Sequence, residues 1–267
     1  MHIDAAEDVD PYQTYNDLIN YSFALGDVSL ISTHTYGFTG ASSLKSEASS
    51  QKKTLWVTED GDGDGSGMTM ARYIYNDIAV MGAMAFVYWQ VVDSAGGWGF
   101  LLNSLLATNS SGYTPNYTIN EKFYVMGQFS EFIRPGCNIV SANDTNTLAA
   151  WNPTNSTLVL VTVNNTGSSF DVTYNLNDFP SEPWQVSVTL TASGKNMATL
   201  PSPLVVSGQF TEAIPVGSVT TFVLTTNVTA PQIVSQSPSS VTNLTLFTGE
   251  NPTFSVSAQG SVPLYYQ

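Results

Sequence analysis

The chain has 267 residues, of which 42% are hydrophobic and 10% are charged. Its 7 basic and 21 acidic residues give a formal net charge of −14, which argues against nucleic acid or an anionic membrane surface as a partner. The single cysteine, Cys137, excludes an internal disulfide, and the sequence has no Cys/His cluster for zinc. These features indicate a globular protein whose charge is compatible with a neutral polymer such as a polysaccharide.

The first 135 residues alternate between strand-like and helix-like patterns. Three short β-rich runs are expected as buried parallel strands: residues 28–34, 54–58 and 84–90. Residues 68–81 carry apolar side chains at helical spacing, and we expect Ser66 to cap that helix. Residues 10–24 and 120–133 predict two further helices. Strand, helix and strand in this order predict a βαβ unit.

The helix predicted over residues 10–24 has clear signals at its start. Asp10 stands in the capping position and Pro11 in the first turn, where proline is favoured. Its expected apolar face consists of Tyr15, Leu18, Ile19 and Phe23. This helix would precede the strand at residues 28–34.

From about residue 135 the helical spacing disappears and short alternating runs begin. They predict an all-β sandwich with strands at residues 148–151, 157–163, 170–176, 184–191 and 218–226. A further boundary falls near residue 230. Beyond it, residues 245–247 and 254–258 predict the opening strands of an immunoglobulin-like module, which is truncated at residue 267.

One carboxylate stands out in the run TLWVTEDGDGDGSG of residues 54–67. Glu59 lies where an apolar strand stops and a glycine-rich loop begins. Barrel enzymes keep catalytic groups at the carboxyl ends of their strands, so Glu59 is a candidate catalytic residue. The alternative is a solvated surface carboxylate.

The loop after Glu59 resembles the start of a calcium-binding EF-hand. Asp60, Asp62, Asp64 and Gly65 copy its first positions, but its twelfth position falls on Ala71, where a bidentate glutamate is needed. We therefore expect no metal ion here and no cofactor. The aspartates are expected to stabilise the positive end of the following helix or to meet sugar hydroxyls.

Four motifs occur in an order that resembles glycoside hydrolase family 30: THTYG (residues 33–37), LWVTE (55–59), VYWQ (87–90) and KFYVMGQFSEFIRPG (122–136). Within that family, the run EDGDGDGSGMTMA (59–71) is most similar to the endo-β-1,6-galactanase-like branch. The resemblance covers roughly residues 1–229.

The resemblance implies a retaining hydrolase with a (β/α)8 TIM barrel and a β-sandwich side domain. It implies that Glu59, at the end of the seventh barrel strand, is the nucleophile. His34 and Tyr36 match a substrate-binding pair on strand six, and Tyr36 is expected to orient Glu59 by hydrogen bonding. Trp89 matches an aromatic floor under the sugar, although a core position is its alternative, and Trp98 is a candidate for a further subsite.

A retaining hydrolase needs a second carboxylate, about 5 Å from the first, as acid/base. The resemblance places it in an Asn-Glu motif at the end of strand four. The only Asn-Glu pair here, Asn120-Glu121, follows strand eight and is interpreted as a helix cap and a first-turn acid. Residues 3–8 look like the mouth of strand five. We therefore expect the N-terminal half of the barrel, with the acid/base, in the full-length protein.

The expected organisation is a partial barrel with strands 6–8 at residues 1–135, a sandwich side domain at 136–229 and a truncated immunoglobulin-like segment at 230–267. The expected function is that of a β-1,6-galactan hydrolase acting on galactan side chains, as a fragment that is inactive alone. A secreted or cell-surface location is expected, and several Asn-x-Ser/Thr sequons fit it.

Two alternatives remain open. A family-30 hydrolase for another β-glycan, such as β-1,6-glucan, xylan or a glucosyl lipid, would share the same site residues. A non-catalytic carbohydrate-binding or cell-surface module would instead need an aromatic platform on the sandwich, where Trp151 and Trp184 are the only tryptophans.

Overall fold

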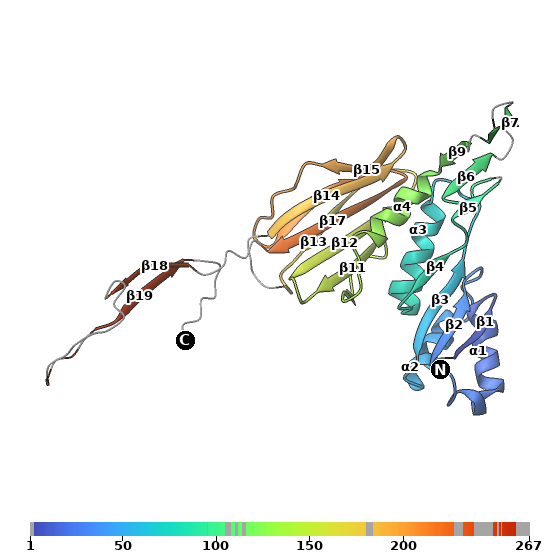
Figure 1. The fold of residues 1–267 in the computed structure, drawn as a ribbon, viewed down its shortest axis with the longest axis horizontal. Helices are drawn as coiled ribbons and strands as arrows, with labels where there is room; N and C mark the ends of the chain where they lie inside the picture. The colour runs from blue at the N-terminus through green and yellow to red at the C-terminus, as the bar shows by residue number, and fades with distance from the viewer. Residues whose placement is uncertain are drawn as a thin grey trace.

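The structure is a computed structural model. It describes residues 3–94, 96–104, 108–109, 112–113, 116–179, 184–226, 232–237, 248–249, 251 and 253–259. An α/β unit at the N-terminal side is followed by antiparallel β-sheets, as Figure 1 shows.

The α/β unit is built on a four-stranded parallel sheet. Its strands, in spatial order, are β1 (Asp4–Asp8), β2 (Leu30–His34), β3 (Thr54–Asp60) and β4 (Phe86–Tyr88). The three strands predicted from the sequence are confirmed, with ends shifted by a few residues. The segment predicted as the mouth of a strand forms the full strand β1, so the sheet has four strands rather than three.

Helices pack on the sheet through apolar side chains. They are α1 (Pro11–Asn20), a 3-10 turn η1 (Ser22–Ala24), α2 (Ala41–Ser50), α3 (Met68–Tyr75) and a π-helical turn η2 (Asn76–Met81) that continues α3. Leu18 of α1 and Leu44 of α2 are buried in one cluster with Ile31, Val57 and Met81. Burial of these apolar side chains holds both helices against β2 and β3 by the hydrophobic effect.

The helix predicted over residues 10–24 is shorter than expected. Its start is confirmed, because Pro11 opens α1 and the Asp10 side chain accepts a hydrogen bond of 2.9 Å from the Gln13 N–H. The helix ends at Asn20, and two members of the predicted apolar face, Ile19 and Phe23, are exposed. Phe23 is wrongly placed by helical spacing because the last turn is a separate 3-10 element.

The start of α3 also differs from the prediction. Gly67 occupies the N-cap position, with a φ of 81°. The helix is capped from further back, since the Asp64 carboxylate accepts hydrogen bonds from the backbone N–H groups of Ser66 (2.9 Å) and Thr69 (3.0 Å). The expectation that an aspartate of this loop stabilises the helix start is thus confirmed for Asp64, and Ser66 is not the principal cap.

The β unit consists mainly of two antiparallel sheets. One has six strands in the order β10 (Asn138–Val140), β11 (Thr147–Asn152), β12 (Thr157–Asn164), β17 (Ser218–Thr226), β14 (Trp184–Ala192) and β15 (Lys195–Leu200), and the other pairs β13 (Phe170–Asn175) with β16 (Gln209–Ile214). The core between the sheets includes Tyr174, Phe210 and Phe222. All five predicted strands are present, and β10, β15 and β16 are additional.

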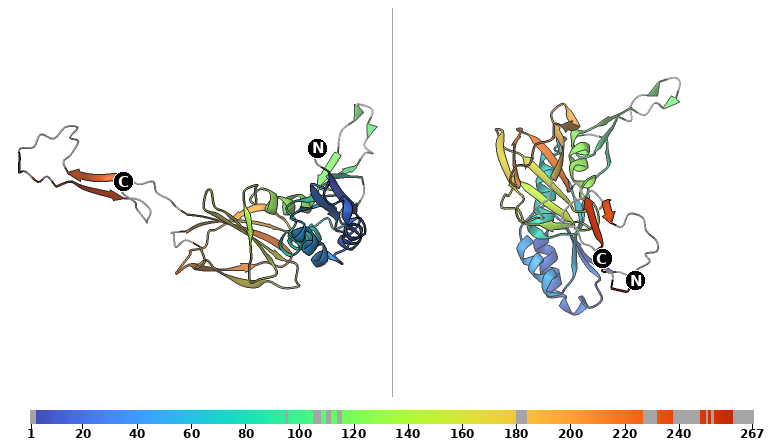
Figure 2. Two further views of the ribbon diagram at one scale, coloured as in Figure 1. Left: turned by 90° about the horizontal axis from the view of Figure 1, so that it is seen from below. Right: turned by 90° about the vertical axis from the view of Figure 1, so that its left-hand side faces the viewer.

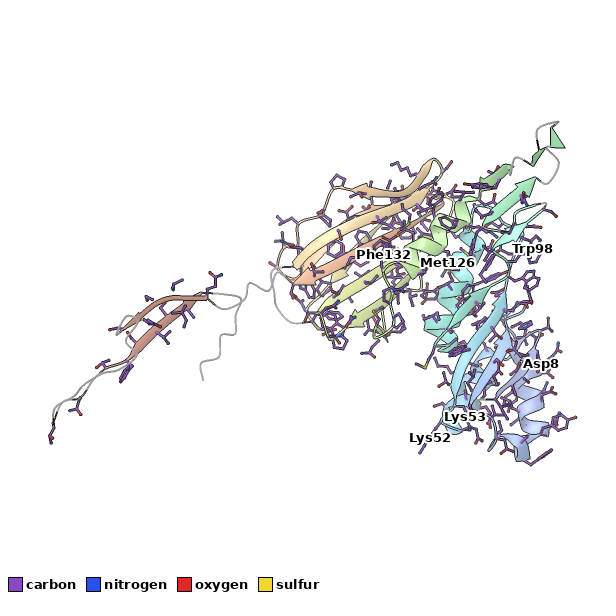
Figure 3. All side chains as sticks on the ribbon, in the orientation of Figure 1. Asp8, Lys52, Lys53, Trp98, Met126 and Phe132 are labelled. Carbon is purple, nitrogen blue, oxygen red and sulfur yellow. The ribbon has the colours of Figure 1, made fainter. Side chains whose placement is uncertain are left out.

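Helix α4 (Glu121–Ser130) joins the two units. Its residues Val125 and Phe129 are buried in a cluster that includes Ile74 of α3 and Val161 of β12, so one apolar core continues from the α/β unit into the six-stranded sheet. In Figure 3, Met126 and Phe132 lie between the two units. The Asn120-Glu121 pair stands at the start of this helix as predicted, although the Asn120 side chain donates to the Gly99 carbonyl instead of capping α4.

An excursion between β4 and α4 was not predicted. It contains β5 (Val92–Asp93), β6 (Leu101–Ser104), β7 (Thr108–Asn109), β8 (Gly112–Tyr113) and β9 (Asn116–Ile119). Strands β6 and β9 pair antiparallel and lead into a projection from the α/β unit (Figure 2).

Near the C-terminus, β18 (Gln232–Ser237) pairs only with β19 (Ser255–Gln259) among the described strands. The strand predicted at residues 254–258 is confirmed as β19, whereas residues 245–247 lie outside the described residues. Two strands do not show an immunoglobulin-like module. Within the described ranges, no helix is both long and apolar enough to cross a membrane.

Candidate active site

Glu59 lies at the carboxyl end of β3, beside the end of β2. The Tyr36 hydroxyl donates a hydrogen bond of 2.9 Å to Glu59 Oε1, and His34 Nδ1 lies 3.8 Å from the same oxygen. Burial and the hydrogen bond to Glu59 raise the pKa of the Tyr36 hydroxyl, so it remains a donor at neutral pH. The structure thus brings together three of the four residues that the sequence marks as a site.

Parallel pairing explains why these side chains meet. The carboxyl ends of β2 and β3 lie at one edge of the sheet, and His34 is paired with Glu59 in the register. The Thr35 N–H donates to the Glu59 carbonyl at 3.2 Å, which extends the pairing past the end of β2. This edge is the one where α/β barrels hold their catalytic groups.

The fourth predicted residue, Trp89, follows directly after β4. Its N–H donates to the Asp60 carbonyl at 2.7 Å, which sets it beside the residue after Glu59. The residue is 49% exposed, so Trp89 is not part of the apolar core that the structure describes. An exposed indole at this edge of the sheet is available for contact with a sugar ring.

Trp98 lies against the glycine-rich loop and is half-exposed. A Cβ on Gly61 would approach its ring to 3.1 Å and would collide with the carbonyl oxygen of Trp89. Glycine at position 61 therefore allows the loop to pass between the two tryptophans. Figure 3 shows Trp98 at the end of the sheet away from Lys52 and Lys53, which precede β3.

Glu7 is a site residue that the sequence did not identify. Its Oε2 lies 3.2 Å from His34 Nε2 and accepts a hydrogen bond of 2.9 Å from the Thr58 hydroxyl. Partial burial raises the pKa of Glu7, but the Ser32 and Thr58 hydroxyls and the His34 ring outweigh it, and the pKa lies below its usual value. The sequence could have identified Glu7 by its position, because it is an acidic residue at a strand end, as Glu59 is.

Lys122 is a second residue near the site that the sequence did not identify. It is fully buried, and its Nζ donates to the Asp62 carbonyl at 2.9 Å, to Asp62 Oδ1 at 3.2 Å and to the Tyr88 hydroxyl. It ties the loop after Glu59 to α4 and β4. The sequence signal for its burial is that Lys122 lies at helical spacing from Val125 and Phe129, which are buried on the same helix.

Two carboxyl groups are buried near the ends of β2 and β3, Asp60 beside Glu59 in sequence and Asp77 in contact with Thr35. Asp60 is 0% and Asp77 1% exposed, and the Thr35 hydroxyl donates to Asp77 Oδ2 at 3.0 Å. Burial, together with the charge of Asp62, raises the pKa of Asp60 to about 7. Burial, together with the charge of Asp60, raises the pKa of Asp77 to about 8. These carboxyls hold protons at neutral pH far more readily than exposed aspartates do.

The three loop aspartates make hydrogen bonds within the protein. Asp60 Oδ1 accepts from the Gly61 N–H, Asp62 Oδ1 from the Asp64 N–H, and Asp64 caps α3. In the part of the chain that the structure describes, no group of three or more His, Cys, Asp or Glu side chains is arranged to hold a metal ion. The turn and cap contacts account for the Asp/Gly pattern of this loop.

No protein-family model matches the chain. Among curated proteins, an endo-beta-1,6-galactanase from Hypocrea rufa is 31% identical over 208 residues, which is 73% of this chain and 40% of that protein. Glucuronoxylanase XynC from Bacillus subtilis (strain 168) is 25% identical over 222 residues, 78% of this chain and 48% of that protein. The chain therefore spans less than half the length of these curated relatives.

Solved structures share the fold. A GH30 endoxylanase from Clostridium papyrosolvens C71 superimposes with a TM-score of 0.65 at 28% identity, covering 84% of this chain and 56% of that one. A family 30 subfamily 8 xylanase from Clostridium acetobutylicum gives a TM-score of 0.63 at 25% identity, with the same coverage.

This chain, with its parallel sheet followed by antiparallel β-sheets, shares its fold with these two glycoside hydrolases over 84% of its length. Within that class, the relatives and the superimposed structures connect this chain to glycoside hydrolase family 30. The four-stranded parallel sheet is consistent with part of a TIM barrel, and the antiparallel sheets with the β domain that accompanies it.

Proposed function

We propose that this chain carries the nucleophile half of a retaining glycoside hydrolase that cleaves β-1,6-linked galactan. The observation that carries the proposal is the hydrogen bond from Tyr36 to Glu59 Oε1 at the carboxyl end of β3. A carboxylate held in this way is fixed in direction before a sugar arrives, which is what nucleophilic catalysis needs.

The chemistry follows from how Glu59 is held. Within the described residues, the hydrogen bond to its carboxylate runs from Tyr36 to Oε1, so Oε2 is the oxygen for attack on the anomeric carbon. Attack displaces the leaving sugar, which takes a proton from the acid/base, and forms a glycosyl ester on Glu59. Water, deprotonated by the same acid/base, then releases the sugar with retained configuration. His34 and Trp89 would contact the sugar during both steps.

Glu7 is a poor candidate for the acid/base. A general acid needs a raised pKa so that it is protonated before it acts, whereas the pKa of Glu7 is lowered. Its Oε2 is also engaged by His34 and Thr58. We therefore propose that the acid/base belongs to a longer protein with a complete barrel, and the partial coverage of the relatives supports this.

The proposed substrate rests on the similarity to the galactanase relative and on the resemblance of the run EDGDGDGSGMTMA (59–71) to that branch. The xylanase relatives favour the alternative of another β-glycan. The alternative of a carbohydrate-binding module lacks its platform, since Trp151 and Trp184 pack edge to face at 6.4 Å and both lie against Phe179. Both are partly buried and pack against the sandwich core, and their rings are not coplanar.

The test compares the longest protein that contains these 267 residues with the 267-residue chain. Each is incubated with β-1,6-galactan, β-1,6-glucan and glucuronoxylan, and the released oligosaccharides are separated by chromatography. We expect the longer protein to cleave galactan and the short chain to cleave nothing. Cleavage of xylan alone would move the assignment to the other β-glycan branch. Galactan cleavage by the short chain, lost in Glu59→Gln, would contradict the proposed missing acid/base.

A further inference from the structure

Glu7 occupies a distorted position at the end of β1. Its φ is 64°, in the left-handed region that glycine favours and a glutamate seldom adopts. The register between β1 and β2 is irregular at the same residue, which makes Glu7 the extra residue of a β-bulge. Bulges near active sites re-aim side chains, and a strained residue of this kind persists where the surrounding contacts hold it.

A second irregularity faces the first. Between β2 and β3 the extra residue is Thr58, directly before Glu59. The Thr58 hydroxyl donates to Glu7 Oε2 at 2.9 Å and lies 3.3 Å from the Thr33 carbonyl. Two bulges on either side of β2 thus direct their side chains to one point, and β2 supplies His34 to the same point.

The His34 ring stands between two carboxylates. Nε2 lies 3.2 Å from Glu7 Oε2, within hydrogen-bond distance, whereas Nδ1 lies 3.8 Å from Glu59 Oε1, beyond it. An ionised carboxylate only accepts hydrogen bonds, so the bond to Glu7 requires a proton on Nε2. In the neutral ring that proton leaves Nδ1 as an acceptor.

We propose that Glu7 is a positioning residue that fixes the Nε2–H tautomer and the ring orientation of His34 beside Glu59. The lowered pKa of Glu7 is consistent with this role, because it keeps the carboxylate ionised. Nδ1 then faces the nucleophile side of the site as a lone pair that can accept a hydrogen bond from a sugar hydroxyl. The inference rests on the proposed function only in treating Glu59 as the nucleophile.

The tautomer can be measured without any activity. The chain contains 2 histidines, His2 and His34, so labelling with ¹⁵N-histidine gives a spectrum in which one ring serves as the internal reference. Nitrogen chemical shifts distinguish the two neutral tautomers at a pH above the histidine range. Where the short chain does not stay in solution, segmental labelling of these 267 residues within the longer protein keeps the same two rings visible.

Three variants complete the experiment. We expect wild-type His34 to show the Nε2–H tautomer as its dominant form, Glu7→Leu to show a mixture, and Glu7→Gln, which keeps an acceptor, to lie between them. Glu131→Leu, at an exposed position after α4, is the matched control and should match wild type. A wild-type ring in the Nδ1–H form, or a Glu7→Leu ring with an unchanged tautomer ratio, would overturn the proposal. If Glu7→Leu alters the His34 tautomer ratio but the longer protein fails to hydrolyse any glycan, the proposed function is contradicted and the role of Glu7 is not.

Discussion

The buried Nζ of Lys122 lies 3.2 Å from Asp62 Oδ1 and 2.9 Å from the Asp62 carbonyl oxygen, three residues after Glu59. Lys122 comes from α4, the helix whose core reaches the six-stranded sheet. The β unit is therefore connected physically to the loop that leaves the nucleophile strand. Through Lys122, packing of α4 on the β unit helps to fix the position of the loop that follows Glu59.

Replacing Lys122 with methionine tests that connection. The change leaves the Asp62 carboxylate in a mostly buried place without its cation, so we expect a loss of about 3 kcal/mol in the free energy of unfolding. Urea denaturation of the longest soluble form measures it. Lys195→Met, at an exposed position of β15, is the control and should stay within about 0.5 kcal/mol of wild type. Equal stabilities for the two variants would show that the ion pair is not structural.

Gly61→Ala tests the close passage of the loop between Trp89 and Trp98. The added Cβ meets the Trp89 carbonyl, so the loop must shift, and we expect a cost of about 1–3 kcal/mol in unfolding free energy. Gly26→Ala is the matched control, because a Cβ there has nothing within 4 Å. The control should be near neutral. A Gly61→Ala protein as stable as the control would mean that the loop is not packed as described.

The buried carboxyls predict how stability depends on pH. With the pKa of Asp60 raised to about 7 and that of Asp77 to about 8, the folded protein holds protons that the unfolded chain releases above about pH 4. Between those limits the folded state binds more protons at these two carboxyls, so their contribution to stability is largest on the acid side and falls as pH rises through the window.

Asp77→Asn should reduce the loss of stability that occurs as pH rises. The amide can still accept from Thr35, but it does not titrate, so the drop in Tm from about pH 5 to about pH 8 should shrink. A change of about 1 kcal/mol corresponds to roughly 2–4 °C for a chain of this size. Asp171→Asn, at an exposed position of β13, should leave the drop unchanged. If Asp77→Asn leaves the pH profile of Tm unchanged, the raised pKa of Asp77 is contradicted.

Tyr36→Phe tests the orientation of the nucleophile in the longer protein. Losing a hydrogen bond to a charged group is worth about 1.5–3 kcal/mol, so we expect kcat to fall by roughly 10- to 100-fold with a smaller change in KM. Steady-state kinetics on the cleaved glycan measure both constants. Tyr21→Phe, at an exposed position after α1, should have wild-type kinetics. Equal kinetics for both variants would remove Tyr36 from the site.

Local pattern was enough to predict much of the α/β unit. The apolar runs before His34 and Glu59 predicted adjacent parallel strands, and parallel pairing then places both residues at one edge of the sheet. The pairing of Tyr36 with Glu59 was predicted from the resemblance rather than from spacing. Helix α2 was missed because its sequence, ASSLKSEASS, buries only Ala41, Leu44 and Ala48 and has a weak helical period.

The remaining site residues depend on contacts that sequence spacing does not encode. Glu7 lies 52 positions before Glu59 and reaches the site through two β-bulges, which shift the register by single residues. Lys122 is charged, and a charged residue is expected at the surface unless its buried partner is known. Its partner Asp62 is 60 residues away in sequence. Their positions near the site therefore follow from the three-dimensional arrangement of the strands and α4, and not from the sequence pattern.

The most direct test of the central claim is to identify the residue that forms the glycosyl ester. The longest protein containing these residues is treated with an activated 2-deoxy-2-fluoro β-galactoside, which slows the release of the ester, and is digested for peptide mass spectrometry. We predict one added sugar on the peptide that contains Glu59, absent from Glu59→Gln. A sugar attached to a different carboxylate, such as Glu7, or a product of inverted configuration from active enzyme, would contradict Glu59 as the nucleophile.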